Sequence, residues 1–247
     1  MNSLQLFDVH CHLDWFADAA GVADAAAELG LGMLACTVTP AGFDVAQDTG
    51  LGEKGNVRLA AGLHPWWVEG ADVEAAVENA RGTSYVGEVG LDFGRRHVQT
   101  AESQLAAFEA ICEATQEGAV LSIHSVAAAG TVLDVLERTG ALGRCRCVFH
   151  WFSGTSDELA RAVRAGCWFS LGERSLATRR GREYARQIPA ERLLTETDLP
   201  KAEESAIDAT DITASIERAI AGIALPRGLK DAQVRELLAS NAAKLLF

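Results

Sequence analysis

The chain has 247 residues, 49% of them hydrophobic, and carries 22 basic against 34 acidic side chains, a formal net charge of −12 at pH 7. A field of that sign repels phosphate, which argues against passive nucleic-acid binding but leaves catalysis on phosphate open, because bound cations or a local basic strip can offset it. The length predicts one globular domain over residues 1–247, and no apolar run is long enough to span a bilayer.

The six cysteines form no CxxC pair and no spacing typical of a disulfide framework, and the run MNSLQLF lacks a basic region followed by an apolar one. Both features predict reduced thiols and a cytoplasmic location. Cys145 and Cys147 share one face of a predicted strand, but two thiols without further ligands nearby are more often buried filler than a metal site.

Short β-type runs alternate along the chain with longer segments whose apolar residues recur at helical spacing. Strands are predicted at 5–10, 33–39, 57–63, 85–89, 120–124, 146–150, 167–171 and 193–197. Helices are predicted between them, for example at 18–29, 73–80, 100–117, 127–138 and 157–165. Eight strand–helix units in this length predict an α/β fold with a parallel sheet, a closed (β/α)8 TIM barrel.

The first predicted strand leads into the run FDVHCHLD, in which His10 and His12 stand two residues apart. On a strand both imidazoles point to the same side and form half of a chelating site for a divalent cation. Four later strand ends each offer one more candidate ligand: Glu88, His124, His150 and Asp198. The carboxyl ends of barrel strands share one face, so we expect all six side chains to converge there. A single histidine is more often a hydrogen-bonded core residue, an explanation that does not account for six ligands together.

Seven runs, in this order along the chain, resemble the TatD family of metal-dependent deoxyribonucleases within the amidohydrolase-like barrels: HCHLD, GLHPWW, GEVGLD, LSIHS, HWFSG, ETDLP and SNAAKLLF. More specifically, HWFSG followed by GCWFS is similar to the TatD-type nuclease of the Qat anti-phage defence systems. The resemblance implies hydrolysis of phosphodiester bonds in DNA, by exonuclease action on single strands or at strand ends. The likeness to Qat also implies protein partners from a defence operon.

The resemblance further implies a binuclear metal site. One divalent ion would be held by His10, His12, Glu88 and Asp198, and the other by Glu88, His124 and His150, so that Glu88 bridges the two. Imidazole and carboxylate ligands are compatible with zinc, magnesium or manganese. Two bridged cations can hold a hydroxide between them and neutralise charge on the attacked phosphoryl group.

Three further side chains receive predicted roles. Asp198 is the candidate for holding the attacking water and accepting its proton. Glu196 shares its strand face and is predicted to orient a ligand, the alternative being a buried charge paired inside the barrel. The resemblance implies that His64, after the third strand, contacts the scissile phosphate or the leaving group; otherwise it stabilises a turn. His97 receives no role.

Substrate contacts are predicted on the same rim. Indoles that follow strand ends could stack on unpaired bases, although packing within the rim is equally expected. Residues 173–192 hold six arginines against three glutamates, the most basic stretch of the chain, and could instead be a solvated helix face. The predicted contacts are Trp66, Trp151, Ser153, Arg174, Arg179, Arg180, Arg182 and Lys201.

The chain departs from the family pattern around the substrate. After His124 and Ser125 comes Val126, where the family has arginine, and the segment LPKAEESAIDATD is acidic with Lys201 as its only cation. Two alternatives to a nuclease therefore stay open. The first is a metal-dependent hydrolase of a small amide, lactone or phosphoester, and the second is a scaffold or binding subunit of a defence complex, which the intact ligand set argues against.

Overall fold

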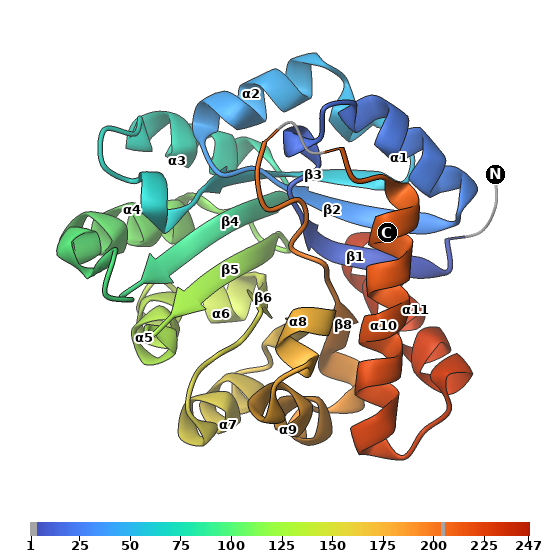
Figure 1. Cartoon of the computed structure of the whole chain (residues 1–247). Helices are drawn as coiled ribbons and strands as arrows, with labels where there is room; N and C mark the ends of the chain where they lie inside the picture. The colour runs from blue at the N-terminus through green and yellow to red at the C-terminus, as the bar shows by residue number, and fades with distance from the viewer. Residues whose placement is uncertain (1–3, 204–205) are drawn as a thin grey trace. The chain divides into compact units, whose positions relative to one another are not determined.

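The computed structural model describes residues 4–203 and 206–247 (Figure 1). In the described residues, eight parallel strands follow one another in the order β1 to β8, the order of a (β/α)8 TIM barrel, which confirms the predicted fold class. The strands are β1 (Leu6–Cys11), β2 (Leu31–Cys36), β3 (Val57–Leu63), β4 (Tyr85–Asp92), β5 (Val120–Val126), β6 (Arg146–His150), β7 (Trp168–Leu171) and β8 (Leu193–Thr195). Most strand residues are buried, as expected where helices cover a parallel sheet.

Helices connect successive strands, and the five predicted ones correspond to α1, α3, α4, α5 and α7. The helices are α1 (Ala19–Glu28), α2 (Pro40–Asp48), α3 (Val73–Gly82), α4 (Ala101–Ala114), α5 (Ala129–Arg138), α6 (Ala141–Arg144), α7 (Ser156–Arg164), α8 (Glu173–Leu176), α9 (Arg179–Gln187), α10 (Ala209–Arg227) and α11 (Asp231–Leu246). Short 3₁₀ turns are η1 (Leu13–Trp15), η2 (Leu51–Glu53), η3 (Pro65–Trp67), η4 (Val98–Thr100) and η5 (Ala190–Arg192). None of the described helices combines the length and the apolar character needed to cross a bilayer.

The chain separates into two compact units. Unit 1 comprises Met1–Ala35, Ala46–Leu59 and Phe169–Phe247, and unit 2 comprises Cys36–Val45 and Ala60–Trp168. The single domain expected over residues 1–247 stays a prediction.

In unit 1 the last strand returns to the first. The backbone amide of Asp198 donates to the carbonyl of His10 at 2.9 Å, and that of His12 donates to Leu199 at 2.8 Å. The Thr195 hydroxyl donates to the Phe7 carbonyl at 2.7 Å. Helices α10 and α11 pack against β1 and β8 (Figure 1). The segments that carry the two predicted ligand groups of unit 1 are therefore joined by hydrogen bonds.

Helix α10 shows how the sequence builds the wall of unit 1. Asp208 begins the helix with a capping box, accepting from the backbone amide of Asp211, whose side chain in turn accepts from the backbone amide of Asp208. Apolar residues at helical spacing, among them Ile212, Ile216 and Ile220, are buried, each stabilising the fold by about 1.5–3 kcal/mol. The helix ends at a residue with left-handed backbone, Gly228.

In unit 2 strands β4 and β5 approach unusually closely. Their register shifts between Val86 and Val89, the stretch that contains Glu88. A Cβ atom on Gly90, which has φ 140°, would lie 2.1 Å from the carbonyl oxygen of His124. Only glycine fits there, and the close approach brings the two predicted ligands Glu88 and His124 together.

Six of the eight strands have bounds that differ from the prediction, and the ends of β2, β4 and β8 have a clear structural reason. Strand β2 ends at Cys36 and not at 39, because Thr39 caps helix α2, with its hydroxyl accepting from Gly42 N at 3.1 Å and Pro40 as the first helical residue. Strand β4 continues to Asp92, which is in register with Val126 of β5, so Glu88 lies inside a strand and not at its end. Strand β8 ends at Thr195, where its pairing with β7 stops.

Candidate metal centre

Unit 1 brings together three of the six predicted ligands. The Nε2 atom of His12 lies 3.4 Å, and that of His10 3.8 Å, from Oδ1 of Asp198. Their donor atoms lie within 4.8 Å of one another. Both histidines are buried, whereas the carboxylate side chain of Asp198 is 22% exposed. Two imidazoles and a carboxylate at this spacing fit a divalent cation.

A buried carboxylate that the sequence reasoning missed holds this group in place. Oδ1 of Asp8 accepts from the backbone amides of His10 at 3.2 Å and Thr197 at 2.9 Å, and Oδ2 accepts from the Thr197 hydroxyl. Burial raises the pKa of Asp8 to about 7, against the opposing effect of the Thr197 and His10 hydrogen bonds. Asp8 stands two residues before His10, so alternation along the strand was the signal available for it.

Glu196 is buried, and its carboxylate accepts a hydrogen bond from the Ser170 hydroxyl of β7. That contact agrees with a charge held within the wall of unit 1, the alternative considered from the sequence. Its role in orienting a ligand stays a prediction.

Unit 2 contains a denser group around Glu88, which is 2% exposed. Oε1 of Glu88 lies 2.7 Å from Nδ1 of His124, 2.7 Å from Nε2 of His150 and 3.2 Å from Nε2 of His64. The donor atoms of His64, Glu88 and His124 lie within 4.8 Å of one another and could hold a metal ion. The predicted ligands of unit 2 therefore converge, and His64 joins them.

Asp92 is a second residue that the sequence reasoning missed. Its Oδ2 atom accepts from Nε1 of Trp66 at 2.6 Å and lies 3.2 Å from Nε2 of His124. Gln104 holds its backbone, accepting from Asp92 N at 2.7 Å and donating to Asp92 O at 3.1 Å. Asp92 is the last residue of VGEVGLD, four positions after Glu88, so alternation along the strand could have identified it. It was overlooked because the predicted strand ended at residue 89.

The two carboxylates around His124 shift its pKa and that of Asp92 in opposite directions. Burial lowers the pKa of His124, but its hydrogen bonds to Asp92 and Glu88 outweigh burial and raise it to about 9. Burial raises the pKa of Asp92, but hydrogen bonds from His124, Trp66 and Gly94 lower it to about 2. In the metal-free protein these groups form an imidazolium–carboxylate pair.

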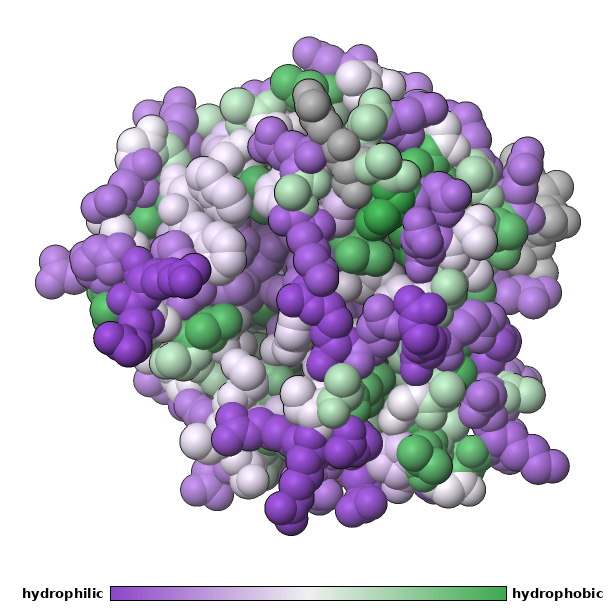
Figure 2. All heavy atoms as spheres, viewed as in Figure 1, coloured by the Kyte–Doolittle hydropathy of each residue, from purple (hydrophilic) through white to green (hydrophobic). Residues whose placement is uncertain are grey.

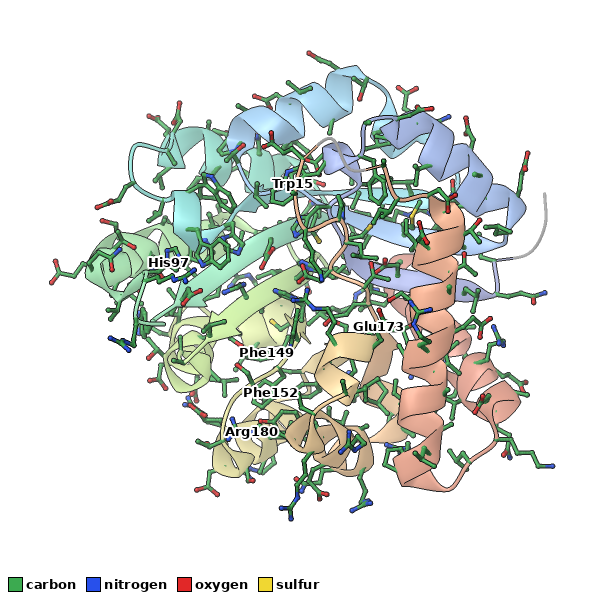
Figure 3. The ribbon with its side chains drawn as sticks, viewed as in Figure 1. Trp15, His97, Phe149, Phe152, Glu173 and Arg180 are labelled. Carbon is green, nitrogen blue, oxygen red and sulfur yellow. The ribbon has the colours of Figure 1, made fainter. Side chains whose placement is uncertain are left out.

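Aromatic side chains lie beside the donor groups of both units, and the two predicted indole contacts, Trp66 and Trp151, belong to unit 2. In unit 1, Trp15, which Figure 3 labels, stacks on His12 with ring centroids 4.7 Å apart. In unit 2, Trp66 is 51% exposed on η3. Trp151 follows β6 with positive φ and is half-buried, and Ser153 is exposed.

The arginine-rich stretch 173–192 forms α8 and α9 in unit 1. Nη1 of Arg174 lies 4.0 Å from Oδ2 of Asp198, so one arginine approaches a predicted ligand. Arg182 instead donates to the carbonyls of Leu176 and Ala177 at 3.0 and 2.8 Å. The side chains of Arg179, Arg180 and Lys201 are exposed.

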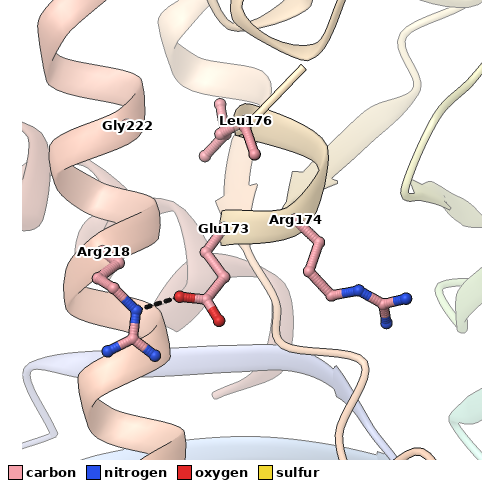
Figure 4. A pocket seen from close by; sticks show the side chains of 6 residues that line it. Glu173, Arg174, Leu176, Arg218 and Gly222 are labelled. Carbon is pink, nitrogen blue, oxygen red and sulfur yellow. Dashed lines mark hydrogen bonds and ion pairs between the residues drawn. The ribbon is translucent and has the colours of Figure 1, made fainter.

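A pocket of about 400 Å³ lies between α8 and α10. Glu173 and Arg218 form an ion pair across it, and Arg174 points away from that pair (Figure 4). Leu176 and Gly222 complete an apolar wall.

The fold and the two donor groups define a (β/α)8 barrel with clustered metal-ligating side chains. A family described as TatD related DNase matches residues 7–247. The chain belongs to this family, as its sequence motifs predicted.

Relatives of known name match parts or all of the chain. The Deoxyribonuclease Tat-D of Schizosaccharomyces pombe is 34% identical over 115 residues, 46% of this chain and 37% of the relative. The 3'-5' ssDNA/RNA exonuclease TatD of Edwardsiella piscicida is 37% identical over 150 residues, 57% of this chain and 56% of the relative. The human Deoxyribonuclease TATDN3 is 26% identical over 266 residues, 97% of this chain and 94% of the relative. The matches to the first two relatives thus span about a third to a half of their lengths.

Solved structures agree on the fold. A TatD family hydrolase from Entamoeba histolytica has a TM-score of 0.82 at 19% identity and covers 100% of this chain and 99% of its own. The TatD homologue YJJV from Escherichia coli has a TM-score of 0.74 at 21% identity, with 98% of both chains covered. These likenesses show the (β/α)8 barrel.

Proposed function

We propose that the chain is a metal-dependent hydrolase of phosphodiester bonds in DNA, acting as an exonuclease on single strands or at strand ends. The observation that carries the proposal is Glu88, a buried carboxylate with three imidazoles around one oxygen, in a family whose relatives are named deoxyribonucleases and exonucleases. Buried clusters of this kind are characteristic of metal sites and not of cores.

The proposed cofactors are two divalent ions, zinc, magnesium or manganese. His10, His12, Glu88 and Asp198 would hold one ion, and Glu88, His124 and His150 the other. The carboxyl ends of barrel strands share one face, which is the reason for assigning both groups to one reaction. When bound, the ions would lower the pKa of a water molecule and neutralise charge on the phosphoryl group.

The protein's own side chains would position and deprotonate the nucleophile. Asp198 is the proposed base, and its partial exposure, unlike the burial of Glu88, makes it reachable by water. His64, 3.2 Å from Glu88, would contact the scissile phosphate or the leaving group. Glu196 would support the ligands of unit 1.

The proposed substrate contacts lie around these groups. Arg174 is the arginine that approaches Asp198, and it would bind a phosphate of the strand. Arg182 also stabilises the end of α8 through two carbonyls. The remaining proposed contacts are Trp66, Trp151, Ser153, Arg179, Arg180 and Lys201.

Digestion of end-labelled DNA tests the proposal. Single- and double-stranded substrates are incubated with metal-free protein and with zinc, magnesium or manganese in turn. We expect products that shorten from one end, faster on single strands, and only with an added ion. Intact DNA under all these conditions would overturn the proposal.

A small-molecule hydrolase is the second candidate. Val126, 38% exposed, stands where the family has arginine, and the net charge of −12 disfavours a polyanion. Turnover of a hydantoin-type amide, with DNA and p-nitrophenyl phosphodiester left intact, would favour this candidate.

We also propose, from the likeness of HWFSG and GCWFS to the Qat nuclease, a cytoplasmic role in anti-phage defence with protein partners from one operon. Tagged protein expressed together with the neighbouring genes should then co-purify with their products. If the tagged chain purified without any of these products, the result would argue against such partners.

A further inference from the structure

Unit 2 carries an exposed aromatic stack beside the Glu88 group. The rings of Trp66 and His97 are nearly parallel, with an interplanar angle of 10° and centroids 4.7 Å apart. Trp66 is 51% exposed and His97 is half-buried. Figure 3 shows His97 on the connection between β4 and α4. A flat aromatic surface therefore stays open to solvent at this point.

Hydrogen bonds hold the Trp66 ring and the backbone of His97. The indole Nε1 of Trp66 donates to Asp92 at 2.6 Å. The carbonyl of His97 accepts from Nε2 of Gln104 at 2.8 Å and from the Thr100 hydroxyl at 2.9 Å. Because the indole is held before a ligand arrives, and the imidazole stacks on it from a fixed backbone, binding loses little side-chain entropy.

Two basic residues come directly before His97 in the chain. Arg95 and Arg96 precede His97, and both are exposed. Neither guanidinium forms an ion pair with any residue in 4–203 or 206–247. Figure 2 shows strongly hydrophilic side chains over the end of β4 and the following connection. In a chain of net charge −12, unpaired arginines beside an open aromatic surface suit an anionic ligand with a planar ring.

We propose that Trp66 and His97, flanked by Arg95 and Arg96, form a stacking platform for one unpaired nucleobase, with the guanidinium groups on the adjoining phosphates. A nucleobase offers the planar ring, and its strand offers the charge. The centroids of Trp66 and His124 are 6.2 Å apart, so the stacked nucleotide would lie next to the Glu88 group. The inference rests on the proposed function for its substrate and adds a reason for preferring single strands, since a paired base cannot leave its stack freely.

Binding without catalysis tests the platform. Fluorescence anisotropy of a labelled pentathymidylate is measured in EDTA at low salt, beside the same strand with one abasic unit at each position in turn. We expect Trp66→Leu and His97→Ala each to weaken binding of the intact strand by about tenfold, within the range for a base–aromatic stack. When the abasic unit is at the stacked position, wild-type protein should bind the abasic strand about tenfold more weakly than the intact strand. Trp66→Leu should then cause no further loss of affinity for that abasic strand.

A conservative variant separates stacking from the contact with Asp92. Trp66→Phe keeps an aromatic face and removes the N–H donor, so most of the affinity should remain. Equal losses in Trp66→Phe and Trp66→Leu, or equal losses on intact and abasic strands at every position, would assign Trp66 to holding Asp92 and overturn the platform.

Salt dependence tests the arginines. Each phosphate contact contributes about −0.7 to the slope of log affinity against log salt for a single strand, so Arg95→Ala with Arg96→Ala should flatten the slope by about 1.4. Arg164→Ala, an exposed arginine in the last turn of α7, is the matched control and should leave the slope unchanged. If Arg164→Ala flattened the slope as much as the double variant does, Arg95 and Arg96 would contribute only to the overall charge of the protein and not to specific phosphate contacts.

These experiments separate failure of the platform from failure of the proposed nuclease function. Base-dependent binding in EDTA with no hydrolysis under any ion would support the platform and overturn the nuclease. Hydrolysis of DNA without any base-dependent binding would overturn the platform alone.

Discussion

The donor groups of the two units differ in how closely their side chains engage one another. In unit 2, one oxygen of Glu88 lies within 2.7 Å of two imidazoles, and Asp92 contacts the far side of His124. In unit 1, the distances to Asp198 are 3.4 and 3.8 Å, and Arg174 lies 4.0 Å away. Hydrogen-bonded donors must give up protons before they bind an ion. We therefore expect ion binding in unit 2 to depend more strongly on pH.

The largest effect should come from Glu88→Ala, which removes the carboxylate that both proposed metal sites share. We expect loss of both ions and a fall in kcat/KM of a thousandfold or more, the scale seen when an essential group is deleted. His124→Ala should release the ion of unit 2 and spare the one in unit 1. Metal analysis of folded protein measures both. Glu102→Ala, on the exposed face of α4, is the control, and a Glu88→Ala protein that keeps one ion would break the proposed bridge.

Asp198→Asn should act on the reaction more than on the ions. An amide cannot accept the proton of water, so kcat should fall by about 10²–10⁴ while the fold persists. Steady-state kinetics and circular dichroism give the two readouts, with Asp24→Asn on the surface of unit 1 as control. An unchanged turnover number would move the base elsewhere, to His64 first.

Asp92→Asn should reduce the difference in pH dependence between the two units. Asp92 helps to raise the pKa of His124 to about 9, so below that pH an ion must displace a proton, and the affinity of unit 2 should rise with pH up to about 9. In the variant this rise should shift to lower pH, and ion affinity should change by about 10–100-fold, as for other residues that hold a metal ligand. Calorimetric titration between pH 6 and 9 measures the shift, and an unmoved profile would contradict the pairing.

Asp8→Asn should change stability in unit 1 by a smaller amount. The pKa of Asp8 is about 7 in the fold against 3.8 for an ordinary aspartate, so the stability it contributes is present below about pH 4 and is lost as pH rises through 7. Asparagine keeps the acceptor for His10 and Thr197 and can donate to the Thr197 hydroxyl. At pH 8 the metal-free variant should therefore have a larger free energy of unfolding than metal-free wild type, by up to a few kcal/mol. Urea titrations at pH 5 and 8 measure this difference, and a difference that is the same at both pH values would contradict the prediction.

The smallest effect should come from Arg174→Gln. A half-exposed cation 4.0 Å from Asp198 opposes an incoming ion weakly, by about 0.2–1 kcal/mol, so the affinity of unit 1 for its ion should rise by up to about fivefold. Arg179→Gln on α9 is the matched control. Weaker ion binding in Arg174→Gln would show that the guanidinium supports the site.

The alternation of strands and helices was predictable because apolar residues recur at helical spacing in helices and form short, nearly continuous runs in the buried strands of a parallel sheet. The end of β2 was predicted too late because the signals that begin α2, Thr39 as cap and Pro40 as first residue, lie within or next to a run that also resembles a strand. The glycines of VGEVGLD shortened the predicted β4 and thereby concealed Asp92.

The candidate ligands were predictable because histidine and carboxylate residues stand out within or directly after the apolar runs that predict strands. Their supporting contacts were not, since each joins distant parts of the chain. Asp8 and Thr197 are 189 residues apart, and Trp66 and Asp92 are 26 apart. No local pattern specifies such pairs, and His97 carries no signal until its stack with Trp66 is seen.

Each unit has an indole next to its donor group, so ion binding in the two units can be followed by fluorescence. Trp15 stacks on His12 in unit 1, and Trp66 is hydrogen-bonded to the partner of His124 in unit 2. Indole emission responds to charge and hydrogen bonding at the ring. We therefore expect replacement of a proton by an ion on His124 to change the fluorescence of Trp66, and ion binding at His12 to change that of Trp15. Because the chain has five tryptophans, the two signals are assigned by difference. Trp66→Phe should remove the emission change that follows ion binding at His124, and Trp15→Phe the change that follows binding at His12, so stopped-flow fluorescence of the two variants can time each event separately.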